Sequence, residues 1–137
     1  VCSLGGSIAT PTGGIRANVV EVKSIKELDS LGEKNIKGKI VFFNRPMQPG
    51  LVNTFKAYEG VRLLRYHGAA NAARYGAVAV LVRSMNLRLD DYPHTGVMSY
   101  GSLPISKRIP AASISTNDGE LLSSMISLNP NLRFFLR

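Results

Sequence analysis

Two arginines follow apolar segments of the chain that read as buried strands. Arg45 comes just after residues 40–43, and Arg83 and Ser84 come after residues 77–82. Open α/β sheets bind ligands at the carboxyl ends of their strands, and arginine binds a carboxylate through two parallel hydrogen bonds. The positions therefore predict contacts to a carboxylate-bearing ligand or protein. The alternative is that each arginine only covers the end of its strand.

A second set of polar residues lies in the loop of residues 83–110, which carries several prolines. Arg88 lies in its first part, and His94, Thr95 and Gly96 form a turn with the preceding proline. A loop of this length in a compact domain usually carries function or packs on another part of the protein. We therefore expect His94 and its neighbours either to face solvent or to reach a partner.

Most patterns of catalytic and cofactor sites are absent from the sequence. No glycine-rich phosphate loop, GxGxxG or GxSxG motif occurs in a suitable context. Cys2 is the only cysteine, which excludes an internal disulfide and a cysteine zinc cluster. His67 and His94 are 27 residues apart with no metal-binding motif near either, and we expect His67 in the core. Asp90 and Asp91 are typical of a solvated loop. We expect no catalytic residue and no metal site in this chain.

Positive charge is concentrated in the middle of the chain. The net charge is +8, and residues 41–88 hold seven basic residues against Glu59 alone. Such a region attracts nucleic acid, lipid head groups, acidic protein or carboxylate ligands. No aromatic platform is interleaved with the arginines, and no recognition signature is present, so we expect no nucleic-acid partner. A free-standing basic domain that binds a ligand or RNA is the alternative function.

The composition is that of one globular domain. The 137 residues are 45 % hydrophobic and 19 % charged, which suits a chain with a sizeable core. Every apolar run is broken well before the roughly 18 residues that a membrane helix needs, so we expect no membrane span. The chain begins at Val1 rather than methionine, which indicates a removed leader or a piece of a longer protein.

Strands and helices alternate along the chain. Apolar or alternating runs predict strands over residues 16–23, 40–43, 77–82, 111–115 and 132–136. Helices are expected after Ser24, over residues 61–75 and after Asn117, with a further helical turn around residues 52–58. The order of strand, helix and strand around residues 61–75 predicts a parallel crossover.

Several segments occur in an order and spacing that one family shares. They are GKIVFFNR at 38–45, AANAARYGA at 69–77, the strand at 78–83, IPAASIS at 109–115 and the helix at 118–125. Across residues 15–137 this set resembles the protease-associated (PA) domain, a non-catalytic insert of zinc aminopeptidases and related proteins. Residues 4–11, 81–84 and 93–98 narrow the resemblance to the carboxypeptidase Q branch of these peptidases.

The resemblance implies a fold of the α+β class, the swivelling β/β/α type, which is a β-sandwich or open barrel flanked by helices. It implies that residues 1–14 are a linker from the parent peptidase domain and that 15–137 are the PA domain. The zinc and the catalytic groups are then expected in the peptidase domain, whose active-site cleft the insert covers. A role in substrate access or protein interaction and an exported parent, secreted, periplasmic or lysosomal, are implied as well.

A peptidase of this class must recognise a free carboxylate, which arginine does well. On this basis we expect a subset of the candidate residues to contact the peptidase domain or a short-peptide substrate. The candidates are Arg45, Arg83, Ser84, Arg88, His94, Thr95 and Gly96.

Overall fold

The computed structural model describes residues 1–50 and 53–137, and its centre is one six-stranded sheet. The strands lie in the order β1-β5-β4-β3-β2-β6. Their bounds are β1 (Cys2–Ser3), β2 (Ile15–Val22), β3 (Ile40–Phe43), β4 (Ala79–Arg83), β5 (Ala111–Ile114) and β6 (Arg133–Leu136). The four central strands, β2 to β5, are parallel, whereas each edge strand is antiparallel to its neighbour.

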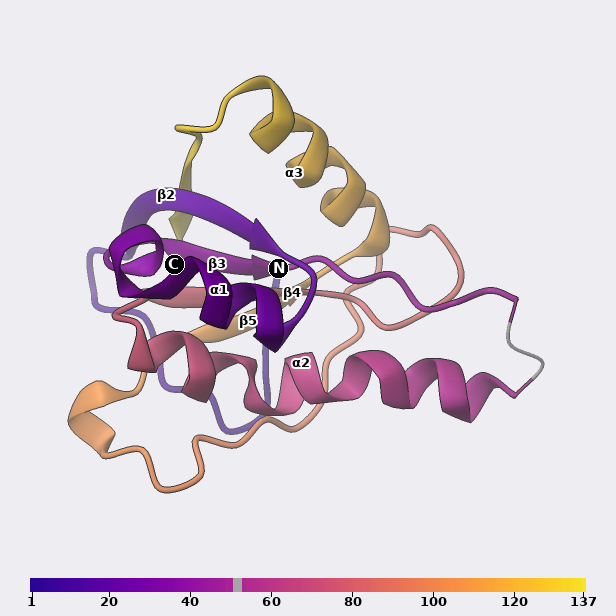
Figure 1. Ribbon diagram of the computed structural model, residues 1–137, viewed down its shortest axis with the longest axis horizontal. Helices are drawn as coiled ribbons and strands as arrows, with labels where there is room; N and C mark the ends of the chain where they lie inside the picture. Colours follow the sequence, from indigo (N-terminus) through magenta and orange to yellow (C-terminus); the bar gives the residue numbers. More distant parts are fainter. Residues whose placement is uncertain (51–52) are drawn as a thin grey trace.

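Helices cover both faces of this sheet (Figure 1). Their bounds are α1 (Ile25–Ile36), α2 (Thr54–Arg74) and α3 (Thr116–Leu128), and a short 3-10 turn, η1 (Ile105–Lys107), lies in the long loop before β5. β3 and β4 are parallel neighbours joined through α2, which confirms the predicted crossover. Within the described residues, no helix combines the length and the apolar composition that crossing a membrane requires.

The core has two halves because the central strands are apolar on both sides. Val41 and Phe43 of β3 belong to the half that α1 and α2 cover. Ile40 and Phe42 belong to the half that Leu122 of α3 covers. Successive side chains of a strand point to opposite faces, so a continuous apolar run is what a sheet between two layers requires.

α2 begins earlier than its apolar stripe predicts. The sequence predicts a helix from residue 61, but the helix already begins at Thr54. The Asn53 side chain accepts hydrogen bonds from the backbone nitrogens of Phe55 and Lys56, at 3.0 and 3.3 Å, and so caps the first turn. The separate turn predicted around 52–58 is therefore part of α2, although Val52 lies outside the described residues.

The other two helices begin at polar caps. Ser24 caps α1 as predicted, and its Oγ accepts a 3.0 Å hydrogen bond from the nitrogen of Glu27. The prediction that Asn117 caps α3 is wrong. Ser115 does so instead, because its Oγ accepts a 3.0 Å hydrogen bond from the nitrogen of Asp118.

The two ends of the described chain lie close together. Val1 and Arg137 both line a cavity of about 300 Å³. The first residues, expected as an entering loop, contain β1, and Leu4 is buried in the core. Together, the mixed sheet and its flanking helices confirm the expected α+β fold of the open-barrel type (Figure 1).

Candidate functional site

The loop that follows β4 is fastened to the strand ends by buried hydroxyl groups. Ser84 Oγ accepts a 2.6 Å hydrogen bond from the backbone nitrogen of His94 and donates to the carbonyl of Ile114. Ser113 Oγ donates to the carbonyl of His94 at 2.9 Å. The peptide groups on both sides of His94 are therefore held against β4 and β5, while its imidazole stays exposed.

The first part of the same loop is held by the beginning of α3. Thr116 Oγ1 accepts a 2.8 Å hydrogen bond from the nitrogen of Asp90 and lies 2.9 Å from the carbonyl of Arg88, to which it donates. Asn86 Nδ2 donates to a carboxylate oxygen of Asp90 at 2.9 Å. The loop is consequently a fixed wall, with Arg88 at its exposed side.

This wall borders a cleft of about 590 Å³ at the carboxyl ends of β3 and β4. The opposite walls come from the segment after β3 and from the first turns of α2. The lining residues are Met47, Phe55, Tyr58, Met85, Asn86, Leu87, Arg88, Asp90 and His94. The rings of Tyr58 and His94 lie 6.2 Å apart. An apolar cleft with a few polar groups is the usual form of a binding site.

Arg65 of α2 lies beside this cleft and is only 9 % exposed. Its Nη1 donates a long, 3.4 Å hydrogen bond to the carbonyl of Thr95, and its Cζ lies 5.6 Å from the centre of the Tyr58 ring. Its Nε is buried with no hydrogen-bond partner. Among the described residues it forms no ion pair. Within residues 1–50 and 53–137 it is therefore a cation without a counter-charge.

Gly96 leaves room for this guanidinium. A Cβ atom at Gly96 would lie 2.5 Å from Nη1 of Arg65, so any side chain there would displace the charged group. The backbone of Gly96 is also engaged, because its carbonyl accepts a 3.0 Å hydrogen bond from the nitrogen of Gly5. The turn of residues 94–96 thus joins the cleft, Arg65 and the first residues of the chain.

Arg83 lies on the other face of the sheet. It is 5 % exposed, and its Nη1 donates to Glu120 at 2.5 Å and to Asn44 at 3.2 Å. Asn44 in turn donates to Glu21 at 2.9 Å. These contacts join the ends of β2, β3 and β4 to α3, and Gly119 allows the close approach, since a Cβ there would lie 3.3 Å from Arg83 Nη1.

The structure thus divides the predicted residues into separate groups. Arg88 and His94 share the cleft, and Ser84 anchors its wall. Thr95 and Gly96 contact Arg65. The structure does not bring the other two to the cleft, because Arg83 binds α3 and the exposed Arg45 does not line the cleft.

His67 does not lie in the core, and two residues beside the cleft, Arg65 and Tyr58, carried no prediction. The prediction that His67 is a core residue is wrong, because it is exposed and packs edge to face on Tyr66, with ring centres 4.7 Å apart. The position of Arg65 on α2, next to the buried stripe that includes Val61 and Gly68, could have indicated its burial.

The described residues do not suit a metal ion. Within residues 1–50 and 53–137, no three His, Cys, Asp or Glu side chains are grouped so that they could hold one.

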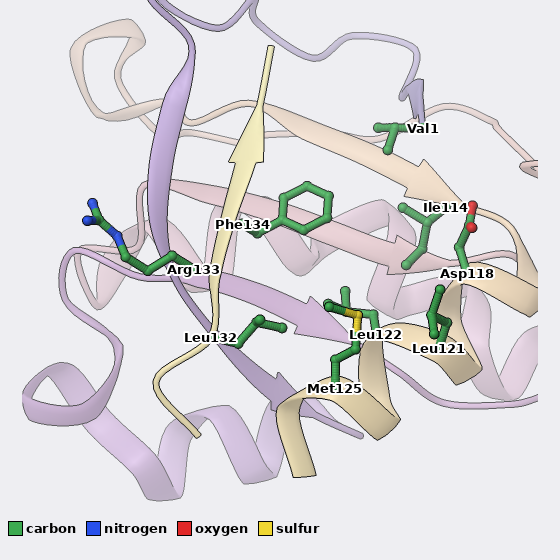
Figure 2. Close-up of a pocket in the computed structure, with 9 residues that line it drawn as sticks. All are labelled: Val1, Ile114, Asp118, Leu121, Leu122, Met125, Leu132, Arg133 and Phe134. Atoms are coloured by element: carbon green, nitrogen blue, oxygen red, sulfur yellow. The ribbon is translucent and has the colours of Figure 1, made fainter. Parts of the chain in front are cut away.

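A further cavity, of about 230 Å³, lies between α3, β6 and the first residue of the chain (Figure 2). Leu121 and Met125 of α3 are 60 % and 42 % exposed and line it. Figure 2 shows the guanidinium of Arg133 directed away from the apolar side chains. With so few polar groups, this cavity is less suited to a charged ligand than the cleft beside Arg65.

A family model described as "PA domain" matches residues 7–122. Carboxypeptidase Q of Xenopus laevis is 42 % identical over 128 residues, which are 93 % of this chain and 25 % of that protein. Carboxypeptidase Q of Homo sapiens is 37 % identical over 128 residues, which again are 93 % of this chain and 25 % of that protein. The chain thus spans about a quarter of these relatives.

Solved structures share the fold. The crystal structure of a "Peptidase M28 precursor" from Shewanella amazonensis aligns with 98 % of this chain and 30 % of its own, with a TM-score of 0.88 and 32 % identity. A zinc aminopeptidase from Bacillus subtilis aligns with 98 % of this chain and 26 % of its own, with a TM-score of 0.57 and 22 % identity. At that identity, the second comparison shows the fold alone.

Proposed function

Because this chain belongs to the PA domain family, we propose that it is the non-catalytic PA segment of a longer, zinc-dependent peptidase similar to carboxypeptidase Q. The relatives are named as carboxypeptidases and aminopeptidases, and the matched segment makes up 25 % of the carboxypeptidase Q sequences. The catalytic groups and the zinc then belong to the remaining part of the polypeptide. The segment contributes a surface rather than a reaction step.

The proposal assigns the cleft beside Tyr58 and His94 to the side that faces the peptidase part. The observation that carries it is a set of large, exposed apolar side chains at this cleft and in the loop that forms its wall. Phe55 and Leu87 line the cleft and are 84 and 47 % exposed. Leu89, Tyr92 and Val97, all in the loop after β4, are 63, 80 and 63 % exposed. Exposed apolar groups at a cleft mark interaction surfaces. Because hydroxyl groups fix the loop, this surface needs no rearrangement before it binds. Seated on the peptidase part, it limits the access of substrate to the active site there.

The placement of the chain ends supports an inserted segment. Val1 and Arg137 line one cavity, so a longer polypeptide can enter and leave at neighbouring points. We assign residues 1–14 to the segment that enters from the peptidase part and 15–137 to the PA domain. An exported parent, secreted, periplasmic or lysosomal, is part of the same proposal.

The first experiment tests the non-catalytic assignment. The purified chain is incubated with zinc and a panel of dipeptides, and hydrolysis is followed with and without a chelator. We expect no turnover. Turnover that the chelator abolishes would contradict the assignment. Salt-sensitive binding of the chain to a single-stranded oligonucleotide would favour a nucleic-acid-binding function instead.

The second experiment tests the surface in the longer polypeptide. The double variant Leu89→Ser and Tyr92→Ser removes two exposed apolar side chains of the loop. We expect cleavage of long peptides to rise relative to dipeptides, because the surface no longer seats on the peptidase part. Leu128→Ser is the control, since Leu128 is 88 % exposed at the end of α3. An unchanged length profile in the double variant would contradict the proposal.

A further inference from the structure

Arg65 is a buried cation that no acidic side chain in the described part of the chain neutralises. The similarly buried Arg83 is paired with Glu120 at 2.5 Å. Arg65, at 9 % exposure, has only a 3.4 Å hydrogen bond to the carbonyl of Thr95 and the face of the Tyr58 ring. Removing a charge from water is costly unless a partner compensates it. A carbonyl at long distance and an aromatic face compensate only in part.

The unused part of the guanidinium has a specific shape. Nη1 is engaged with Thr95, whereas Nε is buried without a partner, and Nη2 has no hydrogen bond within the described residues. Nε and Nη2 form one edge of the planar group, and their two N–H bonds point in parallel. That edge has the shape that the two oxygens of a carboxylate bind. Nη2 is the end that an outside partner reaches first, because it is unpaired without being fully buried, whereas Nε is fully buried.

The surroundings hold the guanidinium in place. The ring of Tyr58 lies on one side, with 5.6 Å between its centre and Cζ of Arg65. The turn at Gly96 lies on another side, where a Cβ would come within 2.5 Å of Nη1. The same turn is fixed through Ser84 and Ser113, which bind the backbone of His94. A fixed guanidinium loses little freedom when it binds.

We propose that Arg65 is a carboxylate-binding residue whose partner comes from outside this chain and meets it beside Tyr58 and Gly96. The inference rests on the proposed function, because it places the carboxylate on the side that faces the peptidase part. Two sources share this chemistry. One is an acidic side chain of the peptidase part, and the other is the free carboxylate of a short peptide.

The chain itself provides the first test. The Nε–H resonance of Arg65 is followed by NMR during titration with N-acetylglycine, and with N-acetylglycinamide as the uncharged match, at constant chloride concentration. We expect a saturable shift with the acid only, in the millimolar range that one ion pair supports. Gly96→Ala removes the response by displacing the guanidinium, whereas Arg74→Gln, at an exposed position of the same helix, keeps it. No saturable shift with the acid would overturn the proposal.

A stability measurement separates binding from a structural role. Arg65→Met keeps most of the packing volume but removes the uncompensated charge. We expect the variant to unfold at the same or a higher temperature than the parent chain, because the lost charge had no partner. A clearly lower unfolding temperature would show that Arg65 stabilises the fold, and would count against a role reserved for a ligand.

The longer polypeptide distinguishes the two sources. Peptides with a free C-terminal carboxylate are compared with their amides in Arg65→Gln and in Arg74→Gln. A KM that rises at least tenfold for free acids alone assigns the carboxylate to the substrate. An equal rise in KM for free acids and amides assigns the carboxylate to the peptidase part. Unchanged kinetics for both would overturn the proposal. Chelator-sensitive turnover by the isolated chain would refute the proposed function but leave the NMR result intact.

Discussion

The backbone nitrogen of His94 donates a 2.6 Å hydrogen bond to the side chain of Ser84, ten residues earlier in the chain. Ser84 is 1 % exposed and directly follows β4. The position of the loop is therefore determined by a hydroxyl group at the end of a strand. Ser84 was singled out as a contact residue, yet its bonds are those of a residue that positions His94.

Ser84→Ala should release the loop without unfolding the domain. The variant leaves the His94 nitrogen without its acceptor, which costs about 1–2 kcal/mol of unfolding free energy. Amide hydrogen exchange at His94 should accelerate strongly. Ser30→Ala, on the exposed side of α1, is the control and should change stability by less than about 0.5 kcal/mol. Unchanged exchange at His94 in Ser84→Ala would show that the loop is held by other contacts.

Arg83→Met should destabilise the domain because it leaves the buried Asn44 oxygen without a donor. We expect a loss of about 1–3 kcal/mol in urea unfolding. Glu120 is 58 % exposed at its side chain and can be hydrated again, so Glu120→Gln should cost less, about 0–1 kcal/mol. In the longer polypeptide, a raised KM for dipeptides with unchanged stability in Arg83→Met would instead support a contact between Arg83 and the substrate.

The strands were predictable because consecutive residues show whether a strand is buried on one face or on both. Ile40 to Phe43 are apolar without interruption, and all four are buried between two helical layers. Gly68 lets α2 lie close to the sheet, because a Cβ there would lie 2.8 Å from the ring of Phe43. Such short-range patterns predict the strands of any fold in which both faces of the sheet are buried.

The site was less predictable because its contacts join distant parts of the chain. Glu120 follows Arg83 by 37 residues, and the carbonyl that Arg65 binds follows it by 30. No local sequence pattern indicates which acidic residue will pair with a given arginine. The start of α2 is capped by Asn53 and packs through Ala57 against Met47 and Met85, which lie on other segments of the chain.

The contact between α1 and α2 should respond to alkaline pH. The hydroxyl of Tyr75 donates a 2.8 Å hydrogen bond to Asp29, and this bond raises the pKa of Tyr75 above its ordinary value. The stabilising contribution is therefore complete below the pKa of the unfolded chain, about 10, and is lost as the pH rises through the folded pKa. Asp29→Asn should lower the pKa of Tyr75 in an NMR titration. Asp118→Asn, on α3, should leave it unchanged, and equal values in both variants would exclude Asp29 as the cause.

Two glycines of α2 should respond in opposite ways to the same substitution. A Cβ at Gly68 would lie 2.8 Å from the Phe43 ring, so Gly68→Ala must push α2 away from β3, which costs about 1–3 kcal/mol. At Gly60 a Cβ would meet no atom within 4 Å, so Gly60→Ala should stabilise the domain by up to about 1 kcal/mol through the better helix propensity of alanine. Urea unfolding of both variants measures the two effects against one reference. Because the residue change is identical, a loss confined to Gly68→Ala reports the close approach of helix and sheet. A gain in both variants would show that the sheet yields to the added methyl group and that α2 is not held against Phe43.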